Sequence, residues 1–312
     1  MSEMLALIKE KGEVLLRTTP RPVCEAPNHV LIRVKMAGIC RTDLAVMRSQ
    51  LVTPEPLIVG HEFAGEIAAI GDQVHHLQVG MHVTAMPLLP CGSCLACLEN
   101  HAESCYCGKM LGLHVSGAFA EYVCLPAEQV YALPADWPTT LSWETAAFSE
   151  PVAAAAAILK ADIHWDVAGA IVGQGRIAEL SMRLLKSQGF EQVELYAHPQ
   201  DLPNNGFAWL IETGLSNACL DPLLTALRPR GLLLLKSRHL PTLQFDPHLL
   251  IRKEIRLQGV YYAAFPWVLQ WLSENAEAVQ DLFGPVYPAQ AWQKALEAAE
   301  AGESLKIFLS WP

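Results

Sequence analysis

Short runs in which apolar and polar residues alternate fill the first 148 residues of the chain. Glycines separate these runs where the chain must bend or pack closely. Alternation with a period of two is typical of half-buried strands. We therefore predict an all-β body here, with strands over four segments: 30–36, 62–70, 82–86 and 118–125.

The pattern changes after Glu150, where a proline and an alanine-rich run to residue 159 favour a helix. Strands are then predicted over 168–172, 192–196, 208–212 and 232–235, and a helix over 177–187. Short apolar strands that alternate with helices predict a parallel sheet covered by helices. The tail is helical in pattern from 266 to 302 and ends in a strand over 306–309. The fold class is therefore α/β, with two domains.

The composition indicates a compact protein that acts on small molecules. The chain has 312 residues, of which 52% are hydrophobic, and a net charge of −10. No basic cluster occurs, so nucleic acid and anionic membranes are disfavoured as partners. Charged residues among the first ten positions argue against a secretory signal peptide. No apolar run approaches the roughly 18 residues that are needed to cross a bilayer. We expect a cytoplasmic protein with reduced cysteines.

Four cysteines with the spacing C-x2-C-x2-C-x7-C form a ladder: Cys91, Cys94, Cys97 and Cys105. Thiolates suit Zn2+, and four from one short segment close a tetrahedral site that leaves no position for substrate. Four unrelated buried thiols are the alternative, but the spacing favours metal ligands. We predict a structural zinc site here. Four further cysteines are expected to be reduced, packed thiols: Cys24, Cys107, Cys124 and Cys219.

A different mixture of side chains precedes the ladder. Cys40 and Asp43 lie in one segment, and His61 and Glu62 in another. A catalytic zinc takes about three protein ligands of mixed type and keeps a position for water or substrate. Taken alone, Cys40 and His61 could instead be a core thiol and a hydrogen-bonded histidine. The neighbouring ladder favours a second metal site.

Six motifs in order carry a family resemblance: GICRTD at 38–43, GHEFAGEI at 60–67, CGSCLAC at 91–97, GAFAEYV at 117–123, SEPVA at 149–153 and a glycine turn at 173–178. With them the chain resembles the zinc-containing medium-chain alcohol and polyol dehydrogenases, in particular the threonine and sorbitol dehydrogenase-like branch. The resemblance implies a GroES-like β-barrel catalytic domain over 1–149, completed by 264–312. It also implies a Rossmann-like doubly wound parallel sheet domain over 150–263.

The resemblance implies a reaction as well. Family members interconvert a secondary alcohol or polyol and its ketone or aldehyde by hydride transfer with NAD(P), and they form homodimers or homotetramers. The catalytic zinc ligands implied are Cys40, His61 and either Glu62 or Glu150. Together with the structural zinc ion of the cysteine ladder, this gives two zinc ions per chain.

Three residues around the first cysteine motif take supporting roles by the same resemblance. Thr42 would relay the proton, although a structural threonine in a turn is the alternative. Asp43 would orient His61, and Arg41 would pair with the cofactor pyrophosphate. A relay histidine of many relatives is replaced by Ala45.

Residues 170–178 read as a strand, a G-x-G-x-x-A turn and a helix. Such a turn cradles a pyrophosphate at a helix N-terminus. The predicted cofactor contacts are Gly173, Gly175, Arg176, Ile177, Ala197 and His198. The last two stand where an acidic residue would be expected to grip the ribose. NAD and NADP therefore both stay open.

The segment 197–206, between two predicted strands, is short. The family places another helix and strand in this interval, so about one αβ unit is missing. An alternative function follows: a zinc-bearing protein of this fold that has lost dinucleotide binding and acts as a non-redox enzyme or as a binding or scaffold protein. The intact glycine turn and Arg41 favour the dehydrogenase.

Overall fold

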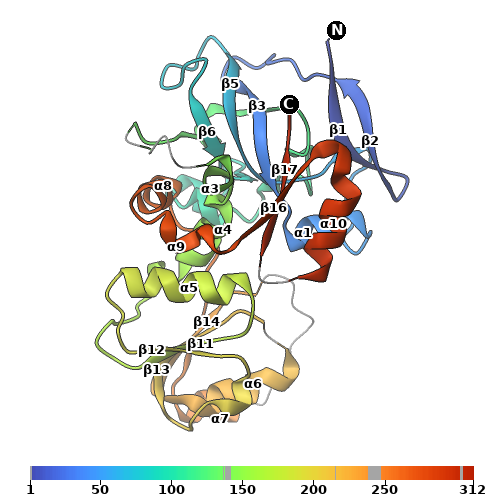
Figure 1. Ribbon diagram of the computed structural model, residues 1–312. Coiled ribbons are helices and arrows are strands. Elements are labelled where there is room, and N and C mark those ends of the chain that lie inside the picture. Colours follow the sequence, from blue (N-terminus) through green and yellow to red (C-terminus); the bar gives the residue numbers. More distant parts are fainter. Residues whose placement is uncertain (1, 136, 138–141, 215, 238–246, 303–304) are drawn as a thin grey trace. The chain divides into compact units, whose positions relative to one another are not determined.

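The computed structural model describes residues 2–135, 137, 142–214, 216–237, 247–302 and 305–312. The chain divides into two compact units, drawn in Figure 1. The first unit comprises Met1–Pro151 and Ala264–Pro312, and the second comprises Val152–Ala263. Among the described residues, no helix combines the length and the apolar character that a bilayer crossing requires.

A seven-stranded sheet forms the body of the first unit. Its strands follow the order β10 (Val130–Ala132), β6 (His82–Ala85), β5 (Glu62–Ile70), β3 (His29–Gly38), β17 (Lys306–Ser310) and β16 (Phe283–Pro288), and β9 (Tyr122–Pro126) also pairs with β3. Strand β3 pairs with β9 through its first half and with β17 through its last residues. The C-terminal strand therefore lies beside the end of β3.

Two smaller sheets complete the β structure of this unit. One has the order β2 (Glu13–Pro20), β1 (Glu3–Glu10) and β4 (Leu57–Ile58), and the other pairs β7 (Leu88–Leu89) with β8 (Lys109–Met110). Buried side chains of β3 and β5, such as Ile32, Val34, Phe63 and Ile67, share one core with Leu7 of β1. The predicted β body of the first unit is therefore confirmed.

Helices interrupt the predicted all-β body. They are α1 (Arg41–Met47), α2 (Leu95–Leu98), α3 (Trp143–Ala147) and α4 (Ser149–Ala156), with the 3-10 helices η1 (Ala102–Ser104), η2 (Ala127–Gln129) and η3 (Ala157–Lys160). The C-terminal segment adds α8 (Phe265–Glu274), α9 (Glu277–Gln280), η5 (Ala289–Ala291) and α10 (Trp292–Ala301). The helical interpretation of 266–302 is therefore wrong for strand β16, which lies inside that range.

The second unit is a five-stranded parallel sheet. Its order is β12 (Val193–Tyr196), β11 (Gly169–Val172), β13 (Phe207–Glu212), β14 (Leu227–Leu235) and β15 (Arg256–Gly259). Helix α5 (Arg176–Ser187) covers one face, and α6 (Asn217–Ala226) and α7 (His248–Arg252) cover the other (Figure 1). Successive residues of a strand point to opposite faces of the sheet, so each face has its own hydrophobic core. Ala170 belongs to the core on the α6 side, and Ile171 belongs to the core on the α5 side.

Strand β12 lies at one edge of this sheet. The chain passes from β12 to β13 through residues 197–206, which contain only the 3-10 helix η4 (Pro199–Asp201). The prediction that this interval lacks an αβ unit is therefore confirmed. The observed sheet also contains β15, for which no strand was predicted, and β14 begins at Leu227 rather than at residue 232.

Candidate functional site

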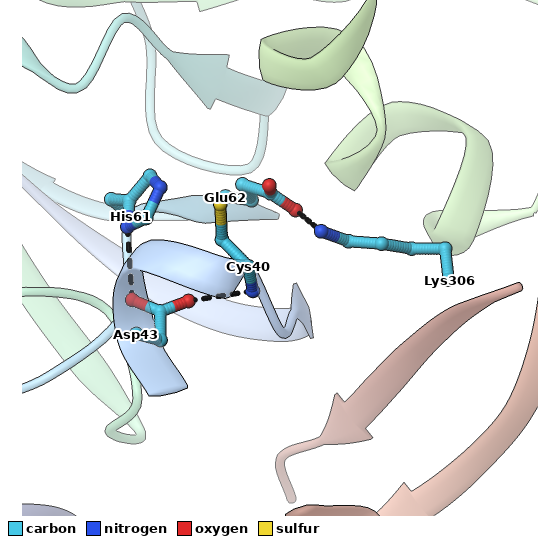
Figure 2. Close-up of polar contacts among 5 residues, drawn as sticks. All are labelled: Cys40, Asp43, His61, Glu62 and Lys306. Carbon is cyan, nitrogen blue, oxygen red and sulfur yellow. Dashed lines mark hydrogen bonds and ion pairs between the residues drawn. The ribbon is translucent and has the colours of Figure 1, made fainter. Parts of the chain in front are cut away.

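The pairing of β3 with β5 brings a thiol, an imidazole and a carboxylate together (Figure 2). Gly38 at the end of β3 pairs with Glu62 at the start of β5, and Cys40 caps α1 two residues later. The ligand atoms of Cys40, His61 and Glu62 all lie within 4.8 Å of one another. Three donors of mixed type at this spacing suit a metal ion that keeps an open position.

Asp43 orients this group. Its carboxylate is fully buried, lies 2.9 Å from Nδ1 of His61, and accepts a hydrogen bond of 2.8 Å from the backbone N–H of Cys40. A carboxylate at Nδ1 fixes the tautomer and leaves Nε2 as the atom for a metal. Among the described residues, Nε2 of His61 has no hydrogen-bond partner although it is buried. A buried imidazole nitrogen without a partner fits a metal ligand.

The protonation of His61 reflects these neighbours. Burial alone would lower its pKa, but the charges of Asp43 and Cys40 outweigh burial and raise the pKa well above the ordinary value of 6.5. An imidazole that binds a metal ion must be neutral, so a metal ion and a proton compete for Nε2 of His61. Metal binding at this imidazole therefore releases a proton.

Lys306 is a member of this group that the sequence analysis missed. Its Nζ forms an ion pair with Oε2 of Glu62, and both side chains are almost completely buried (Figure 2). Phe308 of β17 pairs with Gly38, so β17 carries Lys306 to the same place as β5 carries Glu62. The available signal was a lysine at the start of an otherwise apolar strand, because a buried ammonium needs an ionic partner.

Gly38 makes room for this ion pair. A Cβ at Gly38 would lie 2.5 Å from Cε of Lys306 and 2.6 Å from Oε2 of Glu62, so any larger residue would displace one of them. Burial raises the pKa of Glu62, Lys306 acts in the opposite direction, and Glu150 raises it further. The carboxylate of Glu62 thus forms an ion pair with Lys306 and is at the same time one of the three potential metal ligands, with Cys40 and His61.

The other predicted residues of this site lie around the donor group. Glu150 is buried in the first turn of α4 and acts on the pKa of Glu62. It is not one of the donors within 4.8 Å, whereas Glu62 is. Arg41 is exposed and Thr42 is half-buried, both in the first turn of α1.

The sulfur atoms of the four ladder cysteines lie close together, around α2 and η1. The Sγ–Sγ distances are 3.5 Å for Cys94–Cys97, 3.6 Å for Cys94–Cys105 and for Cys91–Cys105, and 4.0 Å for Cys91–Cys97. A tetrahedron with Zn–S bonds of about 2.3 Å has edges of about 3.8 Å. The four thiols therefore have the spacing of a closed zinc site.

Hydrogen-bond donors lower the pKa of one ladder thiol, and burial raises the pKa of another. The backbone N–H and the hydroxyl of Ser93 lower the pKa of Cys91 to about 5. Burial, together with the other ladder thiols, raises the pKa of Cys97 to about 12.

Cys107 lies just after the ladder in the sequence. The expectation that it is a packed thiol is wrong, because its side chain is exposed.

In the second unit, the glycine turn joins β11 to α5. Gly173 has a φ of 138° and Gly175 a φ of 88°, in the region that favours glycine. A Cβ at Gly173 would collide with Oγ1 of Thr213, so β11 and the end of β13 approach closely only with glycine there. Gly175 caps α5, whose first residues Arg176 and Ile177 present backbone N–H groups at a helix N-terminus.

The carboxyl end of β12 carries no acidic side chain. Ala197 follows the strand, and Nε2 of the next residue, His198, lies 3.5 Å from the amide nitrogen of Gln174 in the glycine turn. Glu212 at the end of β13 is buried and accepts hydrogen bonds from Ser237 Oγ and from two backbone N–H groups after β14. The hydrogen bonds of this carboxylate therefore link the end of β13 to the residues that follow β14.

Comparison with known proteins agrees with this architecture. Residues 26–135 match the family model of the alcohol dehydrogenase GroES-like domain. L-threonine 3-dehydrogenase of Rhizobium etli (strain CIAT 652) is 35% identical over 214 residues, which are 65% of this chain and 60% of that protein. L-threonine 3-dehydrogenase of Legionella pneumophila (strain Corby) is 26% identical over 99% of this chain and 100% of its own length.

Solved structures share the fold. A protein of Sinorhizobium meliloti 1021 described as a zinc-binding dehydrogenase and bound to NADP superposes with a TM-score of 0.86 at 21% identity over 100% of both chains. L-idonate 5-dehydrogenase of Escherichia coli superposes with a TM-score of 0.86 at 22% identity over 99% of both chains. Residues 26–135 are thus similar to the alcohol dehydrogenase GroES-like domain, and the chain shares its fold with these solved structures. Its match to the Rhizobium etli enzyme spans 60% of that relative's length.

Proposed function

We propose that the protein is a zinc-dependent oxidoreductase that interconverts a secondary alcohol or polyol and its ketone or aldehyde by hydride transfer with NAD(P). The observation that carries this proposal is the buried group of Cys40, His61 and Glu62, in which Nε2 of His61 has no hydrogen-bond partner among the described residues. The dehydrogenase names of the relatives support the same reaction.

The residues of the first unit divide the work. Cys40, His61 and either Glu62 or Glu150 would hold the metal, and Glu62 is the glutamate nearer to the other donors. When bound, the zinc ion supplies Lewis-acid chemistry that lowers the pKa of the substrate alcohol. Asp43 keeps His61 in the tautomer that a metal ligand requires.

Thr42 is the proposed proton acceptor beside the substrate oxygen. It lies half-buried in the first turn of α1, next to Asp43. The residue three positions later is Ala45, which has no titratable group. A proton taken up by the Thr42 hydroxyl must therefore leave through cofactor hydroxyls or water rather than through a histidine.

Residues 150–263 form the proposed dinucleotide-binding domain, and 1–149 with 264–312 the proposed catalytic domain. The pyrophosphate would bind at the turn of Gly173 and Gly175, against the N–H groups of Arg176 and Ile177, with Arg41 as a cationic contact. Ala197 and His198 would face the ribose. Neither carries a negative charge that would repel a 2′-phosphate, so NAD and NADP are both candidate cofactors.

The cysteine ladder is the proposed second zinc site. Four thiols at tetrahedral spacing leave no position for substrate, so this zinc would contribute stability rather than chemistry. We also propose a small-molecule alcohol or carbonyl substrate, a cytoplasmic location and a homodimer or homotetramer.

A second candidate function rests on the short segment 197–206, which leaves β12 at the sheet edge. A cofactor domain without one αβ unit offers fewer contacts to adenosine. The protein would then be a zinc-bearing, non-redox enzyme or a binding protein of the same fold.

Titration of the purified chain with NADH and with NADPH separates the two functions. Enhanced nicotinamide fluorescence with either cofactor is expected for the oxidoreductase. A Gly175→Asp variant is the control, because a carboxylate at the helix N-terminus would repel the pyrophosphate. Absence of binding to both cofactors at millimolar concentration would overturn the proposal and favour the second function.

A further inference from the structure

Cys24 and Cys124 lie far apart in the sequence, yet their Sγ atoms are 3.8 Å apart. Cys24 belongs to the connection 21–28 between β2 and β3, and Cys124 belongs to β9. Both are free, half-buried thiols. Neither is part of the two groups of potential metal ligands found among the described residues.

The alternation of β9 explains which side chains meet this connection. Val123 and Leu125 are buried in the core, so Tyr122 and Cys124 point to the opposite face of the strand. The guanidinium of Arg21 lies 3.8 Å from the centroid of the Tyr122 ring. The connection therefore runs along the outer face of β9, from Tyr122 to Cys124.

Backbone hydrogen bonds anchor the connection at both ends. The N–H of Arg21 donates to the carbonyl of Ser2 at 3.0 Å, and the carbonyl of Asn28 accepts from Ala127 at 2.9 Å. Between these anchors Val23 is 64% exposed, whereas Cys24 turns toward β9. The two thiols are thus held near each other in the folded chain, and joining them needs little further ordering.

We propose that Cys24 and Cys124 form a dithiol modification site that low-molecular-weight disulfides oxidise to an intramolecular disulfide. A disulfide has an S–S bond of about 2.05 Å, so the sulfur atoms must approach by about 1.8 Å. Side-chain rotation at two half-buried positions can supply that movement. The bond would fasten the connection 21–28 to β9.

The reaction proceeds by two thiol–disulfide exchanges. The Cys24 thiolate attacks one sulfur of the reagent RSSR, whose S–S bond breaks, and RS− leaves. Cys124 then loses its proton to solvent, attacks the Cys24 sulfur and expels the second RS−. Two protein thiols are oxidised and one RSSR is reduced to two RSH, so electrons and protons balance.

The environment sets the order of these steps. Burial, and then the neighbouring Cys24, raises the pKa of Cys124 to about 12. A thiol that holds its proton is a poor nucleophile, so Cys24 reacts first with the external disulfide. Once Cys24 is in the mixed disulfide it carries no negative charge, and the deprotonation of Cys124 becomes easier.

Oxidised glutathione is the probe that tests this site on the zinc-loaded, full-length chain. After incubation, remaining thiols are alkylated and the protein is digested for mass spectrometry. We expect a peptide pair linked through Cys24 and Cys124, a mass loss of about 2 Da relative to the reduced chain, and reversal by dithiothreitol. Zinc content is measured in the same samples and should not change.

Three single variants locate the chemistry. Cys124→Ser should accumulate one glutathionyl group on Cys24, and Cys24→Ser should leave Cys124 unmodified. Cys219→Ser is the control, because Cys219 lies on α6 in the other unit and should leave the linked pair intact. The proposal is overturned if the wild-type chain collects glutathione on Cys24 without a linked pair, or if only ladder cysteines become linked as zinc is lost.

Discussion

The ammonium group of Lys306 and the carboxylate of Glu62 form an ion pair that is almost completely buried. Glu62 is at the same time one of three donors grouped around a candidate metal position. A buried ion pair is strongly destabilised when one partner is removed, because the other charge is left without compensation. Lys306 therefore compensates the charge of Glu62 when no metal ion is bound.

Replacement of Lys306 by methionine should destabilise the metal-free protein. We expect the free energy of unfolding in chelator to fall by roughly 3 kcal/mol. With zinc present the loss should be smaller, because the metal ion takes over as the counter-charge of Glu62. Urea unfolding with and without zinc measures the difference, and Lys294→Met on the exposed side of α10 is the control. An equal loss in both conditions would contradict the account.

Replacement of Gly38 by alanine tests the room for this pair. The added methyl group would meet both Lys306 and Glu62, so we expect weaker zinc retention at the Cys40 group and a large loss of turnover. Gly259→Ala is a matched control, because no heavy atom lies within 4 Å of a Cβ at that position. Zinc retention against a chelator checks the result. Equal behaviour of the two variants would show that Gly38 does not constrain the ion pair.

The stability of the metal-free protein should depend on the protonation of His61. Its folded pKa is raised well above 6.5, because Asp43 and Cys40 outweigh the opposing effect of burial. A raised folded pKa contributes stability that is fully present below pH 6.5 and is lost as the pH rises through the folded value. Urea unfolding in chelator across this range should show the loss in the wild type. His61→Asn should remove this part of the pH dependence, and a parallel curve for both proteins would refute the assignment.

Replacement of Cys97 by serine should release the structural zinc and lower the melting temperature. A closed zinc site contributes its binding free energy to folding, so loss of one ligand weakens the lobe around α2. Cys107→Ser is the control, because Cys107 lies outside the four grouped thiols and should leave zinc content unchanged. Zinc per chain and thermal unfolding measure both effects. An unchanged melting temperature for the Cys97 variant would argue against the site.

An aspartate in place of Ala197 should shift the choice of cofactor. This position follows the second strand of the parallel sheet, where a carboxylate would bond the 2′-hydroxyl of NAD and repel the 2′-phosphate of NADP. We expect the ratio of kcat/KM for NADP to that for NAD to fall at least tenfold, about 1.4 kcal/mol. An unchanged ratio would mean that position 197 does not face the ribose.

The sequence alone could predict those residues of the candidate site that lie within short motifs. The ladder spacing and the GICRTD and GHEFAGEI motifs identified donors that the structure brings together. Lys306 could not be named, because it reaches Glu62 only through the pairing of β17 with β3. The proximity of Cys24 and Cys124 likewise could not be predicted, because it depends on how the connection 21–28 lies against β9.

The fold was predictable where hydrophobic periodicity was clear. Strand β5 occupies the predicted residues, and α5 begins one residue before its predicted start. Strand β16 has the sequence FGPVYP, in which glycine and prolines obscure the alternation, so it was mistaken for part of a helical tail. The start of β14 was missed because Arg228, Pro229 and Arg230 are exposed and polar, and Arg230 has a φ of 63°.

The most direct test of the central claim couples zinc content to alcohol oxidation in the wild type and in His61→Ala. Reduced nicotinamide is followed with a panel of secondary alcohols and polyols, with NAD and with NADP, while zinc per chain is measured. The account predicts two zinc ions and turnover in the wild type, and one zinc ion without turnover in the variant. Undiminished turnover in a His61→Ala protein that has lost one zinc ion would contradict it.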